Sequence, residues 1–170
     1  MANKKISNAT SITYNGKEFK SKLEKTIYLT LKEKGFNPEY EPKTFVLIDG
    51  FVPKTPFYDK ESDGQFNKRR KNKDFSPRKL ILKSGAIQSI KYTPDFYFNH
   101  NGLDVYIEAK GFENDVFYIK KKLFIKYLDS QDKQSIYFEI YTKSQLLQAI
   151  EIINKYGRNE NTENIGMECR

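Results

Sequence analysis

Two short segments contain the side chains best suited to chemistry. Pro94-Asp95 is followed, after twelve intervening positions, by Glu108-Ala109-Lys110. Because successive side chains of a β-strand point to opposite faces, a strand through these positions places Glu108 and Lys110 on one face and Ala109 on the other. A preceding strand that folds back antiparallel would set Asp95 beside that pair. The spacing therefore predicts two carboxylates and one amine on a single patch.

Such a patch is suited to holding a divalent metal ion. Two carboxylates a few ångströms apart repel each other, and one of them tends to bind a proton unless a cation is present. Mg²⁺ prefers oxygen ligands, so we expect Asp95, Glu108 and the main-chain carbonyl of Ala109 to bind it, with Mn²⁺ as a substitute. The ion would lower the pKa of a bound water and polarise a phosphoryl oxygen. With Lys110 to orient that water or to neutralise transition-state charge, the set predicts phosphodiester hydrolysis.

A hairpin is predicted to bring the two segments together. Residues 87–98 and 103–110 are strand-like runs, and Asn101-Gly102 lies in the connection between them. Asn-Gly is a strong hairpin signal because both residues tolerate positive φ. The two strands should be antiparallel neighbours, with the charged groups on one face. We expect three aromatic side chains on the opposite, core-side face: Tyr92, Phe96 and Phe98.

The remaining elements predict an α/β fold. Apolar residues recur every four positions over 19–34, which indicates an amphipathic helix ended by Gly35. We further predict a strand over 44–51, a helix over 116–128, a strand over 135–141, and a helix over 145–156 capped by Thr142 or Ser144. The order is αβββαβ-like. It favours a central mixed sheet of four to five strands with helices on both faces.

A basic insertion interrupts this pattern. Residues 54–83 hold ten Lys and Arg against four Asp and Glu, a net charge of +6, and include the cluster Lys68-Arg69-Arg70-Lys71-Asn72-Lys73. We interpret 54–83 as an insertion loop, with a short hairpin around Ser84-Gly85, inside a single domain over 19–156. The polar segments 1–18 and 157–170 are expected to be flexible.

Composition narrows the function classes. The 170 residues carry 30 Lys and Arg against 22 Asp and Glu, a net charge of +8, which favours a polyanionic partner such as nucleic acid. His100 and Cys169 are the only histidine and cysteine, so the sequence has no internal disulfide, no Cys-based zinc cluster and little basis for a Ser-His-Asp triad. No apolar run suits a signal peptide or a membrane span. We expect a cytoplasmic protein with no membrane partner and no small-molecule cofactor.

The motif resembles that of the PD-(D/E)XK nuclease superfamily, which includes restriction endonucleases and several junction resolvases. Pro94-Asp95 and Glu108-Ala109-Lys110 match its signature, and Ser21-Lys22-Leu23-Glu24 looks like its helical acidic segment. The run Tyr92 to Phe96, then Ile107 to Gly111 and a Lys-rich helix with Lys120, is similar to small phage-encoded nucleases, some of them Holliday-junction-resolvase-like. The similarity covers roughly residues 19–156.

The resemblance implies a restriction-endonuclease-like core and a Mg²⁺-dependent DNA endonuclease. Its substrate would be branched or duplex DNA in phage or mobile-element DNA processing, inside a bacterial host cell, and cutting both strands would need a homodimer. Implied catalytic residues are Asp95, Glu108, Lys110 and Glu24. The basic side chains expected to hold the phosphate backbone are Lys68, Arg69, Arg70, Lys71, Lys73 and Lys120.

Plainer interpretations stay open beside this one. Asp95 fits a strand edge, Glu108 with Lys110 fits a solvated ion pair worth a few tenths of a kcal/mol, and Glu24 fits the solvent face of a helix. The basic cluster fits a solvated loop as well as a DNA contact. At the level of function, the alternatives are a non-catalytic nucleic-acid-binding protein that keeps the same fold, and an RNA-processing enzyme with the same site.

Overall fold

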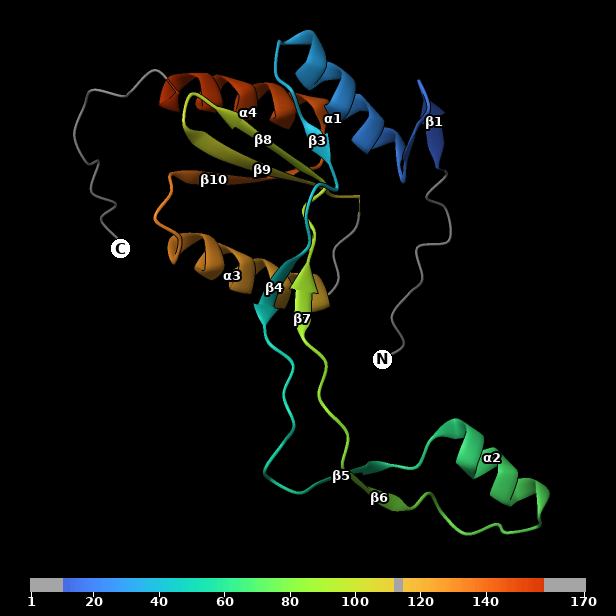
Figure 1. The fold of residues 1–170 in the computed structure, drawn as a ribbon. Helices are drawn as coiled ribbons and strands as arrows, with labels where there is room; N and C mark the ends of the chain where they lie inside the picture. The colour runs from blue at the N-terminus through green and yellow to red at the C-terminus, as the bar shows by residue number, and fades with distance from the viewer. Residues whose placement is uncertain (1–10, 112–114, 158–170) are drawn as a thin grey trace. The chain divides into compact units, whose positions relative to one another are not determined.

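The chain forms two compact units. The computed structural model describes residues 11–111 and 115–157. The first unit comprises the chain up to Leu47 and from Lys91 onward, and the second comprises Ile48–Ile90. The chain passes between them through β4 (Phe45–Ile48) and β7 (Ile90–Tyr92), which pair as a two-stranded sheet (Figure 1).

A mixed four-stranded sheet forms the centre of the first unit. Its strands are β3 (Glu39–Tyr40), β8 (Phe96–His100), β9 (Leu103–Ala109) and β10 (Ser135–Ile140), in the order β10-β9-β8-β3. β9 and β10 are parallel and the other pairs are antiparallel. The predicted mixed α/β architecture is therefore confirmed.

The predicted hairpin is present as β8 and β9. Asn101 and Gly102 have φ values of 51° and 83°, the left-handed conformation that this tight connection requires. Residues 87–98 do not form one strand, however. β7 ends at Tyr92 and β8 begins at Phe96, because Pro94 between them has no N–H to donate to a strand ladder.

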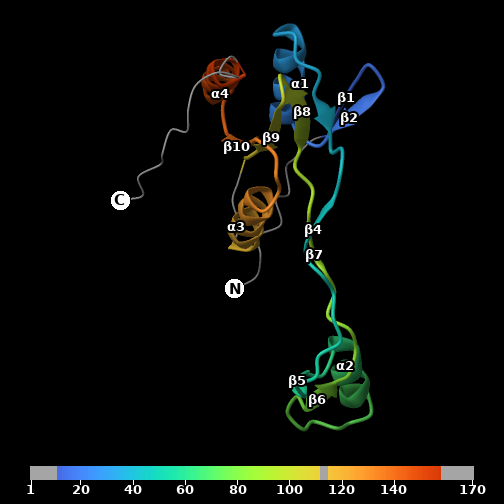
Figure 2. The same ribbon diagram turned by 60° about the vertical axis from the view of Figure 1, so that its left-hand side comes forward.

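Helices cover both faces of this sheet. α1 (Lys22–Glu33) and α4 (Lys143–Tyr156) lie on one face, and α3 (Asp115–Asp129) lies on the other, as Figures 1 and 2 show. The α1 and α4 side encloses a core that includes Ile27, Phe96, Phe98, Val105, Ile107 and Ile153. The α3 side encloses a second core of Phe45, Tyr92, Tyr106, Phe117, Phe124 and Leu128. The sheet is thus buried on both faces.

Local hydrogen bonds fix where the flanking elements begin. Thr142 caps α4 in a reciprocal capping box with Gln145, so Thr142 is the cap and Ser144 is not. The segment predicted to be flexible over 1–18 contains secondary structure in its described part, where β1 (Ile12–Tyr14) and β2 (Lys17–Phe19) form an antiparallel pair. Residues 1–10 and 158–170 of the predicted flexible ends lie outside the described residues.

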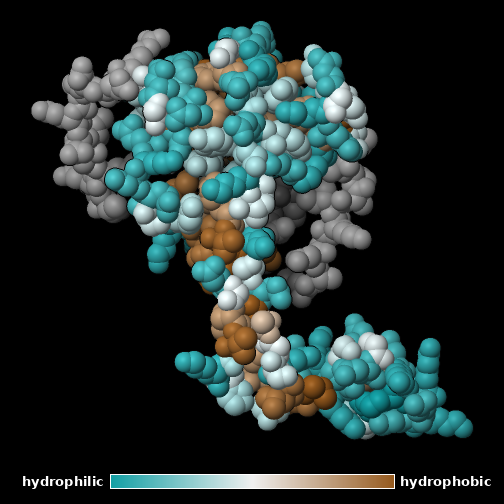
Figure 3. Space-filling model, in the orientation of Figure 1, coloured by the Kyte–Doolittle hydropathy of each residue, from teal (hydrophilic) through white to brown (hydrophobic). Residues whose placement is uncertain are grey.

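The second unit has secondary structure where a loop was predicted. It contains β5 (Phe57–Lys60), α2 (Asp63–Lys71) and β6 (Leu80–Lys83). The predicted hairpin around Ser84-Gly85 is wrong, because β6 pairs antiparallel with β5. No residue of α2 is buried, so it lacks the apolar period by which sequence indicates a helix. Figure 3 shows a hydrophilic surface over α2, whereas the extended part of this unit is largely hydrophobic. Large apolar side chains of the unit, among them Val52, Leu80 and Leu82, are exposed.

Among the helices that the structure describes, none has the length and apolar character needed to cross a lipid bilayer.

Candidate active site

Asp95 and Glu108 face each other at the open end of the β8–β9 hairpin. Phe96 pairs with Ile107, so one step further along the same register Asp95 lies opposite Glu108. The backbone N–H of Ala109 donates to Oδ2 of Asp95 over 2.7 Å, which ties this side chain across to the other strand. The structure therefore brings the two predicted carboxylates together, as the spacing of the motif indicates.

Glu108 is buried and held from two sides. Lys110 donates to Oε1 over 2.5 Å, and the hydroxyl of Tyr92 donates to Oε2 over 2.6 Å. Only 7% of Glu108 is exposed, so the plain interpretation of a solvated surface ion pair with Lys110 is wrong. The hydroxyl of Tyr137 lies 3.1 Å from that of Tyr92 and extends the network to β10.

The placement of Tyr92 corrects one expectation. Phe96 and Phe98 lie in the α1 and α4 core as predicted. Tyr92 lies in the other core and donates to Glu108 from the α3 side of the sheet. The break at Pro94 resets the side-chain alternation, so counting by twos from Phe96 back to Tyr92 fails. Tyr92 and Tyr137 are site residues that sequence reasoning missed, and no local motif marks them.

Asp95 holds a proton more tightly than an ordinary aspartate. Burial, and next the negative charge of Glu108, raise the pKa of Asp95 to about 8. The N–H of Ala109 and the charge of Lys110 oppose this shift, and the charge of Glu24 adds to it. Two facing carboxylates in a partly dry site thus create a demand for a proton or a cation.

Glu24 stands beside this pair in a constrained position. It is 7% exposed, which rules out the solvent-facing alternative. Oε2 of Glu24 accepts from the Tyr40 hydroxyl over 2.6 Å and from the N–H of Lys20 over 2.9 Å. Oε1 accepts from the hydroxyl of Ser21, the residue that caps α1. Its charge reaches Asp95, while its oxygens also anchor the start of α1.

Lys110 and Lys120 border the same hollow. This hollow has a volume of about 350 Å³ and is also lined by Glu108, Tyr92 and Phe117. The ammonium group of Lys110 lies 3.5 Å from the ring centroid of Phe117, which holds it near Glu108. Lys120, which was predicted to contact phosphate, therefore lies in the same hollow as Glu108.

The oxygen donors available here suit a hard cation. Within residues 11–111 and 115–157, no three His, Cys, Asp or Glu side chains come together so that they could hold a metal ion. The donor set is instead Asp95, Glu108 and the carbonyl of Ala109, two carboxylates and one main-chain oxygen. Mg²⁺ is commonly bound through one or two carboxylates with waters in the other positions, so these residues fit it.

The other predicted basic residues belong to the second unit. Lys68, Arg70, Lys71 and Lys73 are exposed, whereas Arg69 is paired with Glu61 and, over 2.8 Å, with Asp74. Glu61 is 2% exposed, and hydrogen bonding to Arg69 lowers the pKa of Glu61 to about 2. Arg69 therefore holds this unit together, and its predicted DNA contact stays a prediction.

Comparison with known proteins adds no assignment. No family model, no curated protein and no solved structure matches the chain at a significant level. We therefore infer function from the residues and geometry of the site alone.

Proposed function

We propose that the chain is a Mg²⁺-dependent DNA endonuclease built on a restriction-endonuclease-like core. The observation that carries the proposal is the opposition of Asp95 and Glu108 across the hairpin, with Lys110 on Glu108. A buried carboxylate pair with an adjacent amine is costly for a fold and is typical of catalytic sites. The net charge of +8 supports a polyanionic substrate.

The site residues have separate roles in this mechanism. Asp95, Glu108 and the carbonyl of Ala109 hold Mg²⁺, which when bound lowers the pKa of water and stabilises charge on a phosphoryl oxygen. Tyr92 and the N–H of Ala109 fix the two carboxylates. Lys110 orients the attacking water or neutralises the charge that develops on the phosphate.

Three further groups support binding around this centre. Glu24 adds negative charge beside Asp95 and strengthens the attraction for a cation. Lys120, at the edge of the same hollow, contacts a substrate phosphate. The exposed basic residues of α2 and the segment after it hold the DNA backbone, since phosphate contacts position a nucleic acid without reading its sequence.

Cleavage assays test the proposal. Purified protein is incubated with supercoiled plasmid and with a synthetic four-way junction, in Mg²⁺, in Mn²⁺ and in chelator. We expect metal-dependent products, and a loss of about a hundredfold or more in rate for Asp95→Asn, Glu108→Gln and Lys110→Ala. Glu151→Gln, an exposed carboxylate on α4, is the matched control and should cleave normally.

DNA binding separates the enzyme from a non-catalytic binder. For the enzyme, Lys110→Ala binds DNA in chelator about as well as the wild type but does not cleave it. A protein that binds DNA in the same way with or without metal, and that gives no products on either substrate, would overturn the proposal.

A further inference from the structure

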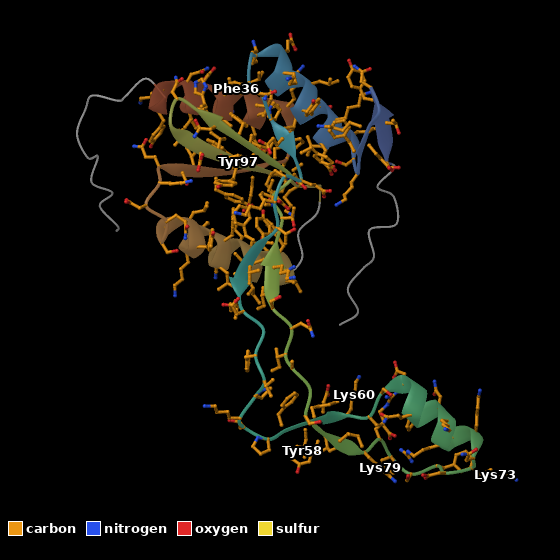
Figure 4. The ribbon with its side chains drawn as sticks, viewed as in Figure 1. Phe36, Tyr58, Lys60, Lys73, Lys79 and Tyr97 are labelled. Carbon is orange, nitrogen blue, oxygen red and sulfur yellow. The ribbon has the colours of Figure 1, made fainter. Side chains whose placement is uncertain are left out.

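A second cavity lies on the α3 side of the sheet and shares no residue with the hollow at Glu108. Its volume is about 430 Å³, within the usual range for small-molecule sites. Tyr97 of β8 and Tyr106 of β9, directly paired in the sheet register, form part of its wall, and Tyr127 of α3 forms another part. Tyr97 packs against the α3-side core and Phe36 belongs to the core on the opposite side of the sheet; both residues are labelled in Figure 4.

Asp104 supplies an acceptor inside this cavity. It is 7% exposed, and its Oδ1 accepts from the Tyr97 hydroxyl over 2.9 Å and from the Asn99 amide over 2.8 Å. Oδ2 receives no hydrogen bond from the described residues. Because every fully buried side-chain oxygen and nitrogen among those residues has a partner, Oδ2 must be accessible, and Asp104 lines the cavity.

Tyr106 supplies a second accessible polar group. It is 7% exposed, and the described residues give its hydroxyl no hydrogen-bond partner. The same reasoning as for Asp104 makes this hydroxyl accessible, and Tyr106 lines the cavity. Both atoms are therefore free to pair with water or with a ligand. Two accessible hydrogen-bonding groups on residues that line one tyrosine-walled cavity fit a ligand that has a flat ring and hydrogen-bonding groups.

The charged side chains that line the cavity indicate which further groups the ligand has. Lys43 and Lys133 line the cavity and are themselves exposed, which places them at its opening. Glu39 is also exposed there. The inner acceptor therefore suits an amino group, the tyrosine rings suit an aromatic ring, and the two outer ammonium groups suit a phosphate.

We propose that this cavity binds one nucleotide whose base carries an exocyclic amino group. The amino group donates to Oδ2 of Asp104, the base lies among the tyrosine rings with a hydrogen bond to the Tyr106 hydroxyl, and the phosphate lies at Lys43 and Lys133. This inference holds whether or not the chain cleaves DNA. The nucleotide is either free or one unit of a single strand, because both present the same chemistry.

Binding to metal-free protein tests the proposal. Amide chemical shifts are followed during titration with dAMP and with dTMP, whose base has no amino group. We expect saturable shifts around Tyr97 and Tyr106 with dAMP, and binding of dTMP at least about tenfold weaker because one charge-assisted hydrogen bond is lost. A short oligodeoxyadenylate that binds much more tightly than dAMP identifies a strand as the source, and equal affinity identifies the free nucleotide.

Two variants assign the effect to the cavity. Asp104→Asn keeps the acceptor for Tyr97 and Asn99 but presents an amide donor to the ligand, so it should reverse the preference toward dTMP. Tyr106→Phe removes a hydroxyl that has no hydrogen-bond partner among the described residues, so it should fold normally and weaken dAMP binding severalfold. Tyr156→Phe, exposed on α4, is the control.

The outcomes are separable from those of the cleavage assay. Asp95→Asn should lose cleavage and keep dAMP binding, because Asp95 does not line this cavity. Failure of both dAMP and the oligonucleotide to bind the wild type would overturn the inference. Binding that neither Asp104→Asn nor Tyr106→Phe alters would overturn it as well.

Discussion

Asp95 makes the stability of the metal-free protein depend on pH. Its pKa of about 8 in the fold lies above the ordinary value of 3.8, so the native state binds this proton more tightly than the unfolded chain does. The stabilisation is complete below about pH 4 and is lost as the pH rises through 8. Above that pH, Asp95→Asn in chelator should exceed the wild type by about 1 kcal/mol or more in unfolding free energy, as measured by urea denaturation.

Added metal provides the control for this prediction. Mg²⁺ should stabilise the wild type above pH 8, because a ligand that binds only the native state raises the unfolding free energy. It should leave the stability of Asp95→Asn nearly unchanged, because this variant lacks the carboxylate that binds the ion. Parallel pH curves for the two proteins in chelator would contradict the raised pKa of Asp95. Equal stabilisation of both proteins by Mg²⁺ would contradict the assignment of Asp95 as a ligand.

Tyr92 and Tyr137 offer a matched pair of substitutions. Tyr92→Phe removes the donor to Oε2 of Glu108, so that Lys110 is the one donor left to this buried carboxylate among the described residues. It should cost about 1–3 kcal/mol in unfolding free energy and lower the cleavage rate. Tyr137→Phe removes only a contact to the Tyr92 hydroxyl, so its cost should be smaller. Equal effects in thermal unfolding and in cleavage would show that Tyr92 does not position Glu108.

At the scale of elements, the sequence predicted those strands and turns that local residue patterns determine. Asn101-Gly102 identified the β8–β9 hairpin, and its register determined which acidic side chains meet. The same reasoning failed at Tyr92, because Pro94 ends one strand and a different strand partner takes over. The pairing of β5 with β6 was not predictable either, since α2 separates them and carries no apolar stripe.

The helix α2 contains two adjacent arginines with different expected roles. Arg69 is held by Glu61, Asp74 and Ser76, whereas Arg70 is exposed and lies 5.0 Å from the ring centroid of Phe75. Arg69→Ala should raise amide hydrogen exchange across 57–83 and leave the first unit protected. Arg70→Ala should leave exchange unchanged and weaken DNA binding. Equal amide hydrogen exchange in the two variants would contradict a structural role for Arg69.

Low pH should destabilise the second unit because it protonates Glu61. Its pKa of about 2 lies below the ordinary 4.5, so the stabilisation is present above about pH 4.5 and is lost as the pH falls toward 2. Exchange in β5, α2 and β6 of the wild type should therefore rise over that range. In Arg69→Ala this pH dependence should be reduced, because the main cause of the lowered pKa of Glu61 is gone.

At the scale of the whole molecule, core and charge are divided between the two units. Neither apolar core has a member within 48–90. That interval carries ten Lys and Arg against five Asp and Glu, so it supplies five of the eight net positive charges. Lys73, labelled in Figure 4 after α2, belongs to this exposed basic set with Lys68, Arg70 and Lys71. The first unit should therefore fold and react without the second, and the second should supply affinity.

Replacement of 52–86 by Asn-Gly tests this division. Phe51 and Ile87 exchange both backbone hydrogen bonds, at 3.0 and 2.8 Å, which is the pair that a two-residue hairpin turn closes. The variant loses ten basic and four acidic residues, so its net charge falls from +8 to +2. We expect a cooperatively unfolding protein that keeps metal-dependent cleavage at low salt and binds DNA weakly.

Salt dependence shows whether the lost affinity comes from phosphate contacts. On duplex DNA each such contact contributes about 0.9 to the slope of log affinity against log salt. The full-length chain with Lys68, Arg70, Lys71 and Lys73 all changed to Gln should lose up to about 3.6 units of slope, measured by fluorescence anisotropy, and the Asn-Gly variant should lose at least as much. If both variants keep the wild-type salt dependence, the second unit does not contact DNA. The positive charge of the first unit, including Lys120 beside Glu108, would then have to account for binding.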